Sequence, residues 1–139
     1  MKTRPIVRSL QLCGVLLLWA GSTASIEAAD LVLVEDGKPR ATILLSAKPT
    51  SASQLAAFEL QHYLEKISGG RLPIVREPKR IEGPVILVGE SQRSRKLGFQ
   101  HQGFAHQEYV VKTHRDGLLL MGHDGRLFDP VRYDSYASL

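Results

Sequence analysis

Cysteine and tryptophan are almost absent from this chain, which contains one residue of each, Cys13 and Trp19. A single cysteine excludes an internal disulfide, the cross-link on which many small exported domains depend. Aromatic residues make up only 6% of the sequence, so few rings are left for a sugar-binding platform. The fold must therefore be held by aliphatic packing or by contact with another folded body.

No apolar run in the amino-terminal region is long enough to anchor the chain in a membrane. The run Leu12–Ala20 is shorter than the roughly 20 apolar residues that a spanning helix needs. Three basic residues precede it, namely Lys2, Arg4 and Arg8. Small residues follow over 21–29, and this order is typical of a secretory signal peptide. We expect cleavage after Ala28 or Ala29, which removes residues 1–29 and leaves a secreted or periplasmic protein without a membrane anchor.

The chain has little excess positive charge once the leader is removed. The leader contains three basic residues and one acidic residue, so the net charge falls from +4 to about +2. Cys13 and Trp19 leave with it, and Cys13 does not fit a lipid anchor because the apolar stretch follows it. A nearly neutral chain of about 110 residues predicts one domain with one core and no nucleic-acid partner.

Two pairs of apolar runs predict two β-hairpins. The first pairs 31–34 with 41–45 around Asp36-Gly37, a dipeptide that tolerates the positive φ angles of a tight reversal. The second pairs 108–113 with 118–122 around another Asp-Gly turn. Both hairpins are expected to belong to one sheet.

Shorter segments between the hairpins complete the predicted sheet. Residues 72–75 read as an edge strand because Pro73 cannot donate to a ladder. Residues 85–88 are apolar without alternation, as in a strand covered on both faces. Residues 91–96 predict a turn of helix, and 97–107 predict a loop.

One long helix is predicted over residues 51–67. Ser51 and Gln54 fit a capping box at its start, and Gly69-Gly70 fits a glycine cap at its end. Apolar residues at helical spacing predict the face that packs on the sheet: Ala56, Leu60, Tyr63, Leu64 and Ile67. The predicted fold class is α+β, a mixed sheet of two hairpins plus central strands with one main helix packed on it.

Motifs for hydrolytic chemistry are incomplete. Residues 89–93 follow a buried strand like a hydrolase nucleophile elbow, but Arg93 replaces the closing glycine, so we expect Ser91 to cap the next turn. Glu90 and Asp124 are candidates for the paired carboxylates of glycoside cleavage, although nothing in the sequence places them opposite one another. We therefore predict no catalytic residue in this chain.

The five histidines do not form a metal-binding motif. His62 and Glu65 lie one helical turn apart without a second such pair, as on a solvated face. His101 and His106 share one loop. A second polar group lies near the ends of the second hairpin: His114, Asp116, His123 and Asp124. Either group could converge on a cation, but loose polar clusters are common at turns, and we predict no metal and no cofactor.

The order of these elements resembles a known family. The carrying motifs are D-G-K-P at 36–39, the helix with its Gly-Gly end at 53–70 followed by L-P-I-V, and I-L-V-G-E-S at 86–91. Over 31–126 the chain is similar to the N-terminal domain of α-glucuronidase-like and β-hexosaminidase-like glycoside hydrolases, as found in large secreted bacterial proteins of uncharacterised function. The resemblance implies a zincin-like topology without metal, packed as an accessory layer against a (β/α)8 barrel that carries the catalytic acid and nucleophile.

The expected function follows from that resemblance. Family members continue past the G-H-D-G-R region, here 122–126, into a helix and the barrel, whereas this chain has an irregular segment over 127–139. We expect a truncated, non-catalytic accessory domain of a secreted carbohydrate-active enzyme, whose exposed apolar patch is normally covered by the barrel. Three alternatives stay open: a complete small secreted domain, a free-standing glycan-binding module, and a metal-dependent enzyme using the loop histidines.

Overall fold

The computed structural model describes residues 30–115 and 117–132, so the predicted leader at 1–29 lies outside the described residues. Within them no helix has the length and apolar character needed to cross a bilayer. The elements in chain order are β1 Val34–Glu35, β2 Lys38–Pro39, β3 Thr42–Leu45, α1 Ser51–Ser68, β4 Ile74–Arg76, β5 Val85–Val88, α2 Gln92–Lys96, the 3-10 turn η1 His101–Gly103, β6 Tyr109–His114 and β7 Gly117–Gly122.

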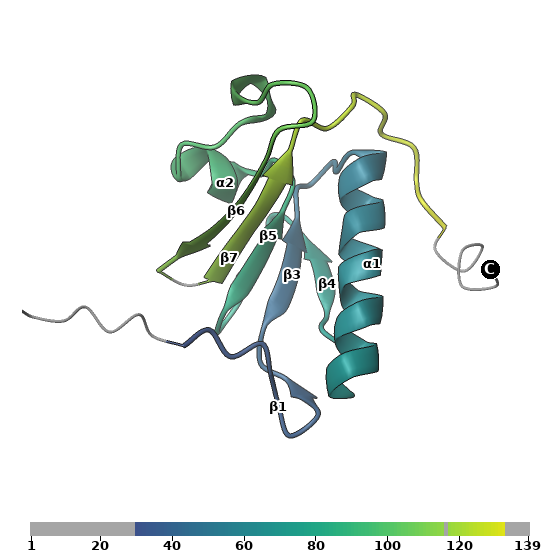
Figure 1. Cartoon of the computed structure of the whole chain (residues 1–139), viewed down its shortest axis with the longest axis vertical. Helices are drawn as coiled ribbons and strands as arrows, with labels where there is room; N and C mark the ends of the chain where they lie inside the picture. The colour runs from purple at the N-terminus through teal and green to yellow at the C-terminus, as the bar shows by residue number, and fades with distance from the viewer. Residues whose placement is uncertain (1–29, 116, 133–139) are drawn as a thin grey trace, which may run out of the picture.

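A five-stranded mixed sheet in the order β4-β3-β5-β7-β6 forms the centre of the fold, with α1 packed along it (Figure 1). Strands β4, β3, β5 and β7 are parallel, and only β6 runs antiparallel, against β7. The carboxyl ends of the four parallel strands therefore meet at one edge of the sheet. The general class predicted from the sequence, α+β with one main helix on a mixed sheet, is confirmed.

The predicted first hairpin is wrong in its pairing. Residues 42–45 lie inside the main sheet as β3, with parallel neighbours β4 and β5 on its two sides. The reversal at Asp36-Gly37 does form, with φ angles of 50° and 70°, but it joins only the two-residue strands β1 and β2 in a separate ribbon. Ile43, Leu44 and Leu45 are almost fully buried, so this strand gains more from a central position than from pairing with its neighbour in sequence.

Most other predicted elements are confirmed, with shifted ends. The strand expected at 72–75 occupies Ile74–Arg76 and is an edge strand, as predicted. All four residues of β5 are buried. The second hairpin forms as β6 and β7. The loop predicted at 97–107 contains the short η1 turn.

The N-cap of α1 lies one residue before the predicted capping residue, Ser51. Thr50 is the N-cap, and its hydroxyl accepts a hydrogen bond from the Ser53 amide at 3.1 Å. Gln54 does not close a capping box; its side-chain amide donates instead to the carbonyls of Pro49 and Asp129, at 3.2 and 3.1 Å. The helix ends at Ser68 before the predicted glycines.

The buried face of α1 also differs from the apolar stripe predicted for it. Ala56 is exposed, and Tyr63 and Ile67 are 58% and 79% exposed, whereas Leu60 and Leu64 do pack on the core. The buried residues of the helix are Ser53, Gln54, Ala57 and Gln61. Three of these are polar, and the side chain of each has a hydrogen-bond partner that offsets the cost of its burial, such as the Leu72 carbonyl, which accepts from Gln61 Nε2 at 2.6 Å.

Helix α1 covers only part of its side of the sheet. It packs against β3, β4 and β5, so on this face of the sheet no helix of the described residues lies over β6 (Figure 1). Tyr109 and Val111 of β6 are 75% and 61% exposed. An open groove of about 210 Å³ lies between the helix and these strands. We call it the apolar groove, and its apolar lining includes Ala52, Ala56, Val88, Tyr109, Val111 and Leu120.

Candidate functional site

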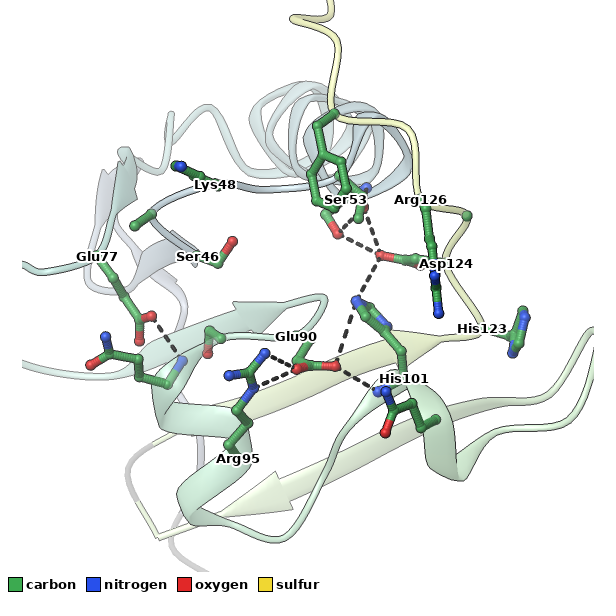
Figure 2. A pocket seen from close by; sticks show the side chains of 17 residues that line it. Ser46, Lys48, Ser53, Glu77, Glu90, Arg95, His101, His123, Asp124 and Arg126 are labelled. Carbon is green, nitrogen blue, oxygen red and sulfur yellow. Dashed lines mark hydrogen bonds and ion pairs between the residues drawn. The ribbon is translucent and has the colours of Figure 1, made fainter.

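An open cleft of about 860 Å³, which several charged and polar side chains line, lies at the carboxyl ends of the parallel strands (Figure 2). The segments after β3, β5 and β7 contribute its walls, together with η1. We call it the edge cavity. Ligands of open parallel sheets bind at this edge, because the loops that leave the strands there surround a crevice. Its volume falls within the range of about 300–1,000 Å³ that is usual for small-molecule sites.

Asp124 forms one wall of the edge cavity and is tied to the start of α1. Its Oδ2 atom accepts hydrogen bonds from Thr50 Oγ1 at 2.9 Å and Ser53 Oγ at 2.6 Å. The Asp124 side chain is only 15% exposed. These hydroxyls satisfy a carboxylate that would otherwise be costly to bury, and they fix the segment after β7 to the helix.

Gly89, which directly follows β5, makes this arrangement possible. Its φ angle is +72°, and a Cβ atom placed there would lie 2.1 Å from Ser53 Oγ and 3.3 Å from Asp124 Oδ2. A side chain would therefore occupy the space in which the serine and the aspartate meet. The glycine of the predicted G-E-S motif is required by packing, and it places Glu90 on the floor of the edge cavity.

Glu90 is held as an ionised carboxylate. Its side chain, 12% exposed, accepts a hydrogen bond from the His101 amide at 2.8 Å and pairs with the Arg95 guanidinium. Burial by itself would raise the pKa of Glu90, but the His101 amide and the hydrogen bond and charge of Arg95 outweigh it and lower the pKa below 4.5. Glu90 therefore stays charged at neutral pH.

His101 lies between the two carboxylates (Figure 2). Its Nδ1 atom is 3.3 Å from the Gly122 carbonyl, which can only accept, so Nδ1 carries a hydrogen. Its Nε2 atom is 3.9 Å from both Glu90 Oε2 and Asp124 Oδ2. This separation is too long for a direct hydrogen bond, and it leaves room for a bridging group.

The remaining charged residues balance the lining of the cavity. Glu77 accepts hydrogen bonds from the Gln92 and Arg93 amides at 2.8 and 3.1 Å and so caps α2. Two exposed cations, Lys48 and Arg126, also line the cavity. With Arg95 they equal the three carboxylates in number, so the lining has little net charge.

Both carboxylates that the sequence singled out are thus brought together, while Ser91 is confirmed as a helix cap. The Ser91 hydroxyl accepts from the Ser94 amide at 3.1 Å, and Ser94 Oγ accepts from the Ser91 amide at 2.8 Å. Sequence reasoning missed His101 as the residue between the acids, because it grouped this histidine with His106. The available signal was the position of His101 shortly after the Glu90 strand.

The histidine clusters do not converge as metal sites. His114 and His123 lie at opposite ends of the β6–β7 hairpin, because His114 pairs with Gly117 while the other end of the hairpin leads to His123. The rings of His106 and His123 are tilted by 50° with their centroids 6.4 Å apart. Asp116 is outside the described residues. Among residues 30–115 and 117–132, no group of three potential metal ligands is found.

The segment after Arg126 is irregular as far as Arg132, yet it is tied to the first turn of α1. The Ser51 amide donates to the Leu127 carbonyl at 2.8 Å, and Ser51 Oγ donates to the Asp129 carbonyl at 3.0 Å. Gln54 also contacts this segment through Asp129. These contacts keep Phe128 at the edge cavity, where it is 58% exposed.

Comparison with known proteins identifies no relative of this chain. No protein-family model, curated protein or solved structure matches the chain. The family resemblance of residues 31–126 therefore rests on the sequence motifs alone.

Proposed function

We propose that this protein is a non-catalytic accessory domain of a secreted carbohydrate-active enzyme, and that its apolar groove packs against the catalytic (β/α)8 barrel. The observation that carries the proposal is the part of the sheet that α1 leaves uncovered. Contiguous exposed apolar surface on a folded domain usually marks an interaction site. The predicted leader at 1–29 supports export, to the periplasm or outside the cell.

The exposed surface continues from the groove along the helix. Ala52, Ala56, Tyr63 and Ile67 lie at intervals of four, seven and four residues, which places them on one face of α1. All four are exposed. Together with Tyr109 and Val111 across the groove, these residues form an apolar surface. A second folded body that packs on this surface would remove it from water. Burial of apolar surface contributes about 25 cal/mol per Å², so such packing would stabilise both bodies.

The state of the paired carboxylates supports a non-catalytic role. Glycoside hydrolysis needs one carboxyl group whose raised pKa keeps it protonated as a general acid. The pKa of Glu90 is lowered instead, chiefly because the stabilising His101 amide and Arg95 outweigh burial. Asp124 is engaged by two hydroxyls that join it to α1. The resemblance implies that the catalytic acids belong to the barrel.

Activity and self-association together test the accessory role. The purified protein should not hydrolyse aryl glucuronides or aryl N-acetylhexosaminides, and it should self-associate through the uncovered face as its concentration rises. Sedimentation velocity would measure the second effect, and Val111→Lys should shift the protein toward monomer while keeping its circular dichroism. The matched control is Val32→Lys, at another exposed valine outside the groove lining. Turnover that is lost in Glu90→Gln or Asp124→Asn would overturn the proposal, as would a strictly monomeric wild type.

A further inference from the structure

We propose that the edge cavity binds a neutral polyhydroxylated ligand, and that Glu90, His101 and Asp124 hold a vicinal diol of that ligand. The inference does not rest on the accessory role. The cavity is formed mainly by the segments after β3, β5 and β7, whereas packing on a barrel would use the outer face of α1 and the β6 surface. Either proposal can therefore fail while the other holds.

The spacing of the three polar groups points to two ligand hydroxyls. His101 Nε2 is 3.9 Å from each carboxylate oxygen, so a hydroxyl oxygen beside either gap can lie within hydrogen-bond distance of both sides. A hydroxyl has one hydrogen and two lone pairs, so a hydroxyl that donates to Glu90 or Asp124 can bond to the imidazole only by accepting a hydrogen carried on Nε2. Two hydroxyls on adjacent carbons could donate one to each carboxylate, and one of them could also accept from Nε2.

The charge of the lining selects for a neutral ligand. Arg95 already pairs with Glu90, and Glu77 is engaged by the first amides of α2. An anion would face the carboxylates of Glu90 and Asp124, whereas a cation would face Lys48 and Arg126 in the same lining. A polyol carries no net charge, and its hydroxyl groups can donate hydrogen bonds to the two carboxylates.

The groups that would bind the diol are held in place without it. Glu90 is fixed by Arg95 and the His101 amide, Asp124 by two hydroxyls of α1, and His101 by the Gly122 carbonyl. A site ordered in advance loses little conformational freedom on binding, which favours affinity. Phe128 lines the same cavity and is 58% exposed, so it can pack on the apolar C–H face of a sugar ring.

Nuclear magnetic resonance titration of the full chain tests the proposal directly. The probe is methyl α-D-glucopyranoside, a neutral ring with vicinal hydroxyls. The matched negative probe is the cyclohexanetriol whose hydroxyls are on alternate carbons. We expect saturable shifts of the Glu90, His101 and Asp124 amides with the glucoside at millimolar concentration, and none with the triol. The absence of saturable shifts with the glucoside, or equal shifts with the triol, would overturn the inference.

A substitution series separates the site from general effects. His101→Ala removes the central group of the site. It should weaken the affinity for the glucoside by about tenfold or more, which corresponds to the loss of one hydrogen bond to a charged or polar group. Glu65→Gln is the control, because Glu65 pairs with Arg71 on α1 and does not line the cavity. If His101→Ala does not fold, the wild-type titration still decides the question through the location of the shifts. Unchanged affinity in a folded His101→Ala protein would contradict the assignment.

Discussion

Replacement of Gly89 by alanine should be among the most damaging single-methyl changes in this protein. The new Cβ would lie 2.1 Å from Ser53 Oγ and 2.9 Å from Ser53 Cβ. The hydroxyl could rotate away only by giving up its 2.6 Å hydrogen bond to Asp124, and the Cβ of Ser53 is fixed by α1. The substitution therefore strains β5, the helix and the segment after β7 together.

The expected magnitude follows from two costs. A positive φ angle costs an L-residue about 1–2 kcal/mol, and forced overpacking adds about 1–3 kcal/mol, so we expect Gly89→Ala to lower the free energy of unfolding by about 3 kcal/mol. For a domain of this size each kcal/mol lowers the melting temperature by about 4–8 °C. Urea denaturation followed by circular dichroism, with a thermal melt alongside, would measure both quantities.

Gly98→Ala is the matched control. Gly98 also has a positive φ angle, +86°, but no atom lies within 4 Å of the position that its Cβ would occupy. The Gly98→Ala variant should therefore show only the conformational effect, a decrease of about 1 kcal/mol in the free energy of unfolding. Alanine restricts the unfolded chain in the same way at both positions, so this contribution cancels in the comparison. Equal losses for the two variants would refute the close approach of Gly89 to Ser53.

Three further substitutions test other parts of the structure. Because the folded pKa of Glu90 is lowered, its charge contributes stability that is complete above the unfolded pKa near 4.5 and is lost as the pH falls through the folded value. Glu90→Gln should therefore have a smaller acid-induced drop in its urea midpoint than wild type, and an unchanged drop would contradict the pairing with Arg95. Gln61→Ala should lower the free energy of unfolding by about 2 kcal/mol, because it removes the buried donor to the Leu72 carbonyl. Urea denaturation would measure the change. A loss below about 0.5 kcal/mol, which is usual for surface substitutions, would argue against that hydrogen bond. Val111→Lys should leave the melting temperature within a few degrees of wild type, because the side chain is 61% exposed; a large drop in calorimetry would mean that this face is already covered.

The elements that the sequence predicted well are those specified by local signals. The helix could be located within one residue at its carboxyl end, because apolar spacing and the following glycines act over a few residues. The second hairpin was predictable for the same reason, since its two strands adjoin one tight turn. Ser91 could be assigned as a cap because a hydroxyl before a short helix has few other roles.

Predictions that depended on distant partners were less successful. The buried face of α1 was misplaced because Gln54 and Gln61 are buried by hydrogen bonds to residues that follow the helix in sequence. Hydrophobic spacing alone cannot show such bonds, so it assigns these polar positions to the solvent-facing side of the helix. The strand at 42–45 was paired with its neighbour in sequence, although its two partners in the sheet follow it by 30 residues or more.

The sequence by itself determined where the chain forms its long helix, its buried strand and its second hairpin, because these depend on side-chain periodicity and on turn residues within one segment. Tertiary structure decided that Glu90, His101 and Asp124 face one cavity. Parallel pairing of β3, β5 and β7 brings their carboxyl ends to one edge, and no local pattern records that long-range pairing. Helix α1 lies over β3, β4 and β5 and, among the described residues, leaves the same face of β6 without a helix, which is the feature on which the proposed accessory role depends.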